Sequence, residues 1–138
     1  MFLPTLLYAG GDELVLRGLE EYCASANYRF AIVGQHHIER TMIFDREQIL
    51  ILDFDGLEEP LVVLAQLKDS DKALPLIVLS SVVPEALTLL SVARMDGAEA
   101  FHWKPIHNWS NVAASIDATV ARMQRWHESL QGVVQQPC

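Results

Sequence analysis

Ile49-Leu50-Ile51-Leu52, ending at Asp53, is the stretch that decides the fold of this 138-residue chain. A short run of branched apolar residues predicts a strand buried on both faces, as in a parallel sheet covered by helices. Two later runs have the same form: Leu76 to Leu79 ends at Ser80, and Ala100 to Trp103 ends at Lys104. Polar residues that follow parallel strands lie at the carboxyl edge of the sheet, where ligands bind. We therefore expect Asp53, Ser80 and Lys104 to meet in one crevice.

Strand-like and helix-like segments alternate along the whole chain. The predicted strands are Thr5 to Ala9, Tyr28 to Val33, Ile49 to Phe54, Leu76 to Ser80, and a fifth that ends at Phe101 to Trp103. The predicted helices are Asp12 to Ser25, His37 to Phe44, Pro60 to Lys68, Pro84 to about Asp96-Gly97, and Asn108 or Ser110 to about Trp126. Parallel neighbours need right-handed crossovers, which here are helical. The pattern predicts a doubly wound five-stranded parallel α/β sheet in the order 2-1-3-4-5, filling residues 1–130, with a polar tail or start of a linker over 131–138.

Composition narrows the class of protein. The net charge is −8 and the pI is about 4.9, and the 10 Lys and Arg residues are scattered. Nucleic acids and anionic membranes are bound by clustered cations, so we expect neither as a partner of this domain. Cys23 and Cys138 form no disulfide framework or metal-ligand spacing, and the start of the chain has no signal-peptide pattern. These features predict a cytoplasmic protein.

The polar residues at the strand ends resemble those of the receiver domains of bacterial two-component response regulators. Asp53 falls where that family keeps its phosphoacceptor aspartate, Ser80 where it keeps Ser or Thr, and Lys104-Pro105 where it keeps a Lys-Pro with a cis peptide bond. Phe101 falls on its aromatic switch residue. The segment Asp96 to Phe101 is also similar to the family's Ala-Gly-Ala-Asp-Asp-Tyr run. The resemblance covers nearly all of residues 5 to 126.

The resemblance implies a role in phosphorelay signal transduction. A histidine kinase would phosphorylate Asp53, or the domain would bind another signalling protein. Ser80, Lys104 and Phe101 would contact the phosphoryl group or relay the change that phosphorylation causes. The change would reach the surface of the fourth helix, fifth strand and fifth helix, which is also the surface implied for a homodimer. The chain would be no enzyme beyond self-phosphorylation and dephosphorylation at Asp53, and an output domain would follow the tail.

One departure from the family concerns the metal. Receivers hold Mg²⁺ with an acidic pair directly after the first strand, where this chain has Gly10-Gly11 or, in the alternative register, Ala9-Gly10. Mg²⁺ is usually held by one or two carboxylates together with water and substrate oxygens. Losing the pair should therefore weaken binding severely. Asp53, Asp12 and Asp55 remain as weak candidate ligands, so we expect no firmly bound cofactor.

Three functional hypotheses follow from these residues. The first is a phosphorylated receiver in which Lys104 and Ser80 neutralise charge around Asp53. The second is a pseudo-receiver that signals by docking to a protein partner without phosphoryl chemistry, with Asp53 paired to Lys104 in a closed site. The third is a flavodoxin-like domain that binds a phosphorylated ligand at the Gly10-Gly11 turn, although the fuller glycine fingerprint is absent.

Overall fold

The computed structural model describes residues 3–34, 47–69, 75–84, 86–95 and 98–135. It consists of the strands β1 (Thr5–Ala9), β2 (Arg29–Ile32), β3 (Gln48–Asp53), β4 (Leu76–Ser81) and β5 (Ala100–Lys104), and of the helices α1 (Glu13–Ala26), α3 (Pro60–Asp69), α4 (Ala86–Met95) and α5 (Trp109–Gln135), with a short 3₁₀ helix, η2 (Phe54–Gly56), directly after β3. The predicted helix over residues 37–44 lies outside the described residues.

The five strands form one parallel sheet in the order β2-β1-β3-β4-β5. This is the predicted doubly wound order, and its switch point lies between β1 and β3, whose carboxyl ends adjoin through the pairing of Ala9 with Leu52. All six residues of β3 are buried, as expected for a central strand whose two faces are both covered.

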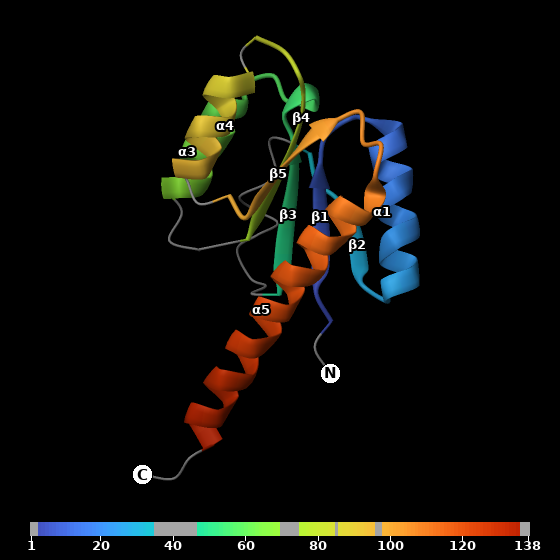
Figure 1. The fold of residues 1–138 in the computed structure, drawn as a ribbon. Coiled ribbons are helices and arrows are strands. Elements are labelled where there is room, and N and C mark those ends of the chain that lie inside the picture. The colour runs from blue at the N-terminus through green and yellow to red at the C-terminus, as the bar shows by residue number, and fades with distance from the viewer. Residues whose placement is uncertain (1–2, 35–46, 70–74, 85, 96–97, 136–138) are drawn as a thin grey trace.

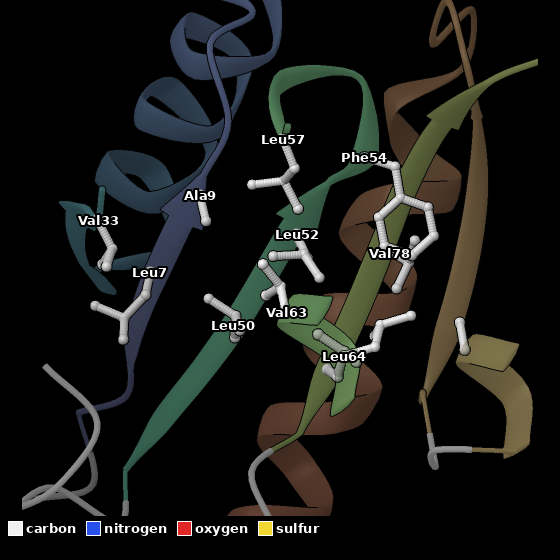
Figure 2. Close-up of a cluster of buried hydrophobic side chains, with 12 residues drawn as sticks. Leu7, Ala9, Val33, Leu50, Leu52, Phe54, Leu57, Val63, Leu64 and Val78 are labelled. Carbon is white, nitrogen blue, oxygen red and sulfur yellow. The ribbon is translucent and has the colours of Figure 1, made fainter. Parts of the chain in front are cut away.

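Helices cover both faces of the sheet. In Figure 1, α3 and α4 lie on one face, and α1 and α5 lie on the other. Alternate residues of each strand point to opposite faces, so each face has its own core. Figure 2 shows the core on the α3 and α4 side, where Leu7, Leu50, Leu52 and Val78 of the strands meet Leu64 of α3. The second core joins Leu6, Tyr8, Ile49, Ile51, Ile77 and Leu79 to α1 and α5.

The ends of α1 follow the local sequence. Asp12 is the N-cap, since its side chain accepts hydrogen bonds from the backbone N–H groups of Leu14 and Val15. Asn27 ends the helix in the left-handed conformation at φ 62°, which asparagine tolerates better than most residues. The turn into β2 therefore begins at Asn27.

The last helix differs from its predicted length. We expected it to end near Trp126, but α5 continues to Gln135. The helix continues through Gly132 even though glycine costs a helix about 1 kcal/mol relative to alanine. Among the described residues, no helix is both long and apolar enough to cross a membrane.

Candidate functional site at the carboxyl edge of the sheet

Asp53 is the centre of a buried polar cluster at the carboxyl end of β3. Its side chain is completely buried. One carboxylate oxygen, Oδ2, accepts hydrogen bonds from the Tyr8 hydroxyl and the Lys104 ammonium, each at 2.9 Å. The other, Oδ1, accepts the backbone N–H of Asp55 at 3.1 Å. Both oxygens are thus satisfied within the protein, as a buried carboxylate requires.

Lys104 lies among three carboxylates. Its Nζ is 2.8 Å from Asp12 Oδ2, 2.9 Å from Asp53 Oδ2 and 3.0 Å from Asp55 Oδ2, and its side chain is only 8% exposed. Burial disfavours the charged ammonium, but the hydrogen bonds to these carboxylates outweigh that effect and raise the pKa of Lys104 above its ordinary value. The cluster therefore holds a single, permanently charged cation.

The two outer carboxylates are held in place by further donors. The Lys104 ammonium lowers the pKa of Asp12, whose other oxygen caps α1. Burial opposes ionisation of Asp55, but hydrogen bonds from Ser81 and Lys104 prevail and lower its pKa. The Ser81 hydroxyl donates to Asp55 Oδ2 at 2.6 Å, and the Ser81 N–H also reaches that carboxylate. Asp12 and Asp55 are consequently ionised counterions of Lys104.

Tyr8 adds a hydroxyl to the site that the sequence pattern did not predict. Its ring lies in the core between the sheet and α1, and its hydroxyl both donates to Asp53 and accepts the Asp12 N–H at 3.3 Å. Burial and the neighbouring Asp53 carboxylate raise the pKa of Tyr8 far above its ordinary value of 10.0, so the phenol keeps its proton. The only available signal was the position of Tyr8, two residues before Gly10 in β1, and an aromatic residue in a strand is usually read as core.

The loops after β1 and β3 touch through glycines. A Cβ atom on Gly56 would lie 2.6 Å from the backbone nitrogen of Gly11. A Cβ atom on Gly10 would lie 2.6 Å from Asp53 Cβ and 2.7 Å from the Tyr8 hydroxyl oxygen. Position 10 therefore has no room for a side chain in this arrangement, whereas Gly11 has no atom within 4 Å of its added Cβ.

The other predicted site residues lie at the same edge but do not all contact Asp53. Ser80 is buried in β4, and its hydroxyl donates to the Ser81 carbonyl at 3.0 Å. Phe101 packs edge-to-face against Phe54, with ring centroids 6.3 Å apart, and against Trp103 at 4.9 Å. The Lys104-Pro105 peptide bond is cis, as predicted. The convergence of Asp53 and Lys104 is also confirmed, while Ser80 lies nearby without bonding to either.

Several solved structures with the same arrangement of strands and helices are response regulator receivers. A signal receiver domain of a putative LuxO repressor protein from Vibrio parahaemolyticus is 21% identical, with a TM-score of 0.71 over 98% of this chain and 99% of that one. A CheY-like receiver domain protein from Methanospirillum hungatei is 14% identical, with a TM-score of 0.74 over 89% and 98%. The chain has the response regulator receiver fold.

One of the matching structures is a longer protein that contains this fold as a part. Full-length FixJ from B. japonicum is 14% identical and matches with a TM-score of 0.75 over 94% of this chain and 63% of FixJ. No protein-family model matches the sequence, and no curated protein sequence matches it significantly. At these identities the likeness establishes the receiver fold.

The receiver fold implies a Mg²⁺ ion at this edge, and the residues present do not fit one. Position 10 carries no carboxylate and has no room for one. Asp12, Asp53 and Asp55 each direct an oxygen to Lys104, so an ammonium lies where their charges converge. Among the described side chains, no group of three or more His, Cys, Asp or Glu residues is arranged to hold a metal ion. We therefore derive no chemical step through Mg²⁺.

Proposed function

We propose that this receiver-fold domain is a pseudo-receiver: a signalling module that docks to a protein partner and carries out no phosphoryl transfer at Asp53. A single observation carries the proposal. Asp53 is completely buried, and its Oδ2 accepts hydrogen bonds from both Tyr8 and Lys104. A nucleophilic carboxylate must present a free oxygen to the phosphorus atom. Here Oδ2 would have to lose two hydrogen bonds first, and Oδ1 would have to lose the backbone N–H of Asp55.

The charges of the cluster support the same proposal. One ammonium faces the carboxylates of Asp12, Asp53 and Asp55, so anionic groups outnumber cationic ones. A phosphoryl donor brings further negative charge, which must be stabilised where it develops in the transition state. With Lys104 already committed to three counterions, its ability to stabilise an incoming phosphoryl group is reduced.

A second candidate function is a phosphorylated receiver that uses a substitute carboxylate. The favouring observation is the position of Asp12: besides capping α1, it extends Oδ2 to within 2.8 Å of Lys104, beside Asp53. In this alternative, Asp12 would take over part of the role of the missing acidic pair, and a histidine kinase would be the partner.

Amide NMR spectra distinguish the two functions. We would record them with Mg²⁺ alone and then with Mg²⁺ plus acetyl phosphate, a small phosphoryl donor. The pseudo-receiver proposal predicts unchanged resonances for Asp53, Asp55 and Ser81 in both additions. Saturable shifts at these residues, lost in Asp12→Asn, would favour the second candidate instead. Asp12→Ser, which retains a capping hydroxyl, controls for damage to the start of α1.

A further inference from the structure

A cavity lies between α1 and α5, on the face of the sheet opposite α3 and α4. Figure 1 shows these two helices on that face. The cavity has a volume of about 450 Å³ and is lined by residues of both helices. Small-molecule sites in proteins have volumes of roughly 300–1,000 Å³. The lining residues are different from those that bond to Asp53, so this cavity is separate from the polar cluster at the carboxyl edge.

One wall of the cavity depends on a glycine in the middle of α1. A Cβ atom on Gly18 would collide with the six-membered ring of the Trp109 indole, so this ring lies directly against the backbone of α1. Glycine weakens the interior of a helix relative to alanine, so its place here needs a reason. The close approach of Trp109 supplies that reason, and it fixes an aromatic ring beside the cavity.

A second aromatic wall is held by hydrogen bonds. Tyr22 of α1 lines the cavity, and its hydroxyl donates to the carboxylate of Asp117 on α5. Asp117 Oδ1 also accepts the Tyr28 hydroxyl at 2.9 Å, and the rings of Tyr22 and Tyr28 pack edge-to-face with their centroids 5.9 Å apart. The Tyr22 ring is therefore held in place before any ligand binds, which reduces the entropy that binding costs.

The floor of the cavity is apolar. Leu19 of α1 and Val112 and Ile116 of α5 line it, and all three belong to the buried core on this face of the sheet. An apolar floor between aromatic walls suits the hydrocarbon part of a ligand, because the ligand then removes apolar surface from water.

The charge at the cavity is negative. Among the described residues that line it, Glu21 alone is charged at neutral pH. Arg17 lies one turn earlier on α1, but the ion pairs found among the described residues do not include Glu21. Aromatic rings attract cations through their negative faces, and a carboxylate attracts them directly. The walls and Glu21 together therefore favour a positively charged ligand.

We propose that this cavity is a binding site for a small organic amine in its protonated form. The apolar body of the amine covers Leu19 and Ile116 between the rings of Trp109 and Tyr22, and its ammonium group lies beside Glu21. A neutral or anionic molecule of the same shape gains nothing from the carboxylate. The site is independent of the chemistry at Asp53, so the inference does not rest on the proposed pseudo-receiver function.

Amide NMR titrations of the full chain with three probes of similar shape test the proposal. Phenethylamine is positively charged at neutral pH, 2-phenylethanol is neutral and phenylacetate is negatively charged. Phenethylamine should give saturable shifts at Gly18, Ala113 and the Trp109 indole N–H, with a Kd of roughly 1–10 mM, as expected for so small a ligand. The alcohol should bind roughly threefold more weakly, which is the value of one exposed ion pair, and phenylacetate more weakly still. Binding of the alcohol or the acid as tight as that of the amine would overturn the proposal.

Three variants locate the site and the source of its charge preference. Glu21→Gln should weaken phenethylamine binding by roughly threefold and leave 2-phenylethanol binding unchanged. Glu20→Gln is the matched control, since it removes the same charge from the neighbouring position of α1, outside the cavity lining, and should change neither. Ala113→Phe fills the cavity and should abolish binding of both probes, with circular dichroism as the check on folding.

Three results would contradict a site between α1 and α5. The first is a parent protein without saturable shifts at Gly18 and Ala113 in the phenethylamine titration. The second is amine binding that Glu20→Gln weakens as much as Glu21→Gln does, because the preference would then come from the overall charge of the protein. The third is a folded Ala113→Phe variant that binds both probes as tightly as the parent.

Discussion

The Tyr8 hydroxyl donates a hydrogen bond to Asp53 Oδ2 at 2.9 Å, across the junction of β1 and β3. The same oxygen accepts the Lys104 ammonium. The hydrogen bond between Tyr8 and Asp53 links β1 to β3 across 45 positions of the sequence, and it closes the site from the side of α1.

Removing the Tyr8 hydroxyl should destabilise the fold modestly. In Tyr8→Phe, Asp53 Oδ2 loses one of its two donors, and we expect the free energy of unfolding to fall by about 1.5–3 kcal/mol, the usual net range for a hydrogen bond to a charged group. Urea denaturation measures the change. Tyr28→Phe is the matched control: its hydroxyl bonds to Asp117 at an exposed position, so its loss should cost clearly less. Equal losses in the two variants would contradict a special role for Tyr8.

Alanine at the two adjacent glycines should have opposite consequences. At position 10 the new Cβ meets Asp53 and Tyr8 at 2.6–2.7 Å, so Gly10→Ala should destabilise the protein by about 1–3 kcal/mol, as overpacking usually does. Gly11→Ala meets no atom within 4 Å and should be close to neutral. Thermal unfolding of both variants decides the matter. A tolerated Gly10→Ala would mean that Tyr8 readily leaves Asp53.

This contrast also bears on restoring the acidic pair of receivers. An aspartate at position 10 would meet the same atoms as alanine, so the double change Gly10→Asp with Gly11→Asp cannot regain metal binding in the present arrangement. The glycine at position 10 and the tyrosine at position 8 are sterically matched.

Stability should decline at high pH, starting near pH 10. The pKa values of Tyr8 and Lys104 are both raised above their ordinary values of 10.0 and 10.5. The folded protein therefore keeps protons that the unfolded chain releases, and this contribution to stability, fully present below pH 10, is lost as the pH rises toward the folded pKa values. Denaturation midpoints between pH 8 and pH 11.5 measure the effect. Tyr8→Phe should show a shallower decline, and an identical slope would argue against this assignment.

Replacing the ammonium should create an affinity for divalent cations. Mg²⁺ titration of the parent should give no saturable binding at millimolar concentration, because Lys104 satisfies Asp12, Asp53 and Asp55. In Lys104→Met these three carboxylates lose their counterion, and hard cations with oxygen preference should then bind. Calorimetry with Mg²⁺ and Mn²⁺ provides the measurement. Saturable binding by the parent would instead show that Asp12 already serves as a metal ligand.

The sequence predicted the sheet well because its strands are short, buried and separated by clear helix signals. The run from Ile49 to Leu52 predicted the central strand, and the helix predicted from Asp12 to Ser25 agrees with α1 to within one residue at each end. The length of α5 was harder to predict, because Gln131, Gly132 and the residues after them have the composition of a polar tail and still continue the helix to Gln135.

The site could be predicted in part. Asp53 and Lys104 converge because parallel strands align their carboxyl ends, which is a topological consequence of the sequence pattern. The contribution of Tyr8 could not be derived, since a strand aromatic is ordinarily a core residue and only the geometry shows its hydroxyl reaching Asp53. The double function of Asp12, which caps a helix and binds Lys104, depends on the loop geometry and was equally hidden.

The most direct test of the central claim is the intact mass of the protein after incubation with acetyl phosphate and Mg²⁺, with Asp53→Asn measured in parallel. The closed site predicts one unmodified mass for both proteins, because Asp53 Oδ2 is occupied by Tyr8 and Lys104. A covalent phosphoryl group on the parent that is absent from Asp53→Asn would contradict the pseudo-receiver account and establish Asp53 as a phosphoacceptor.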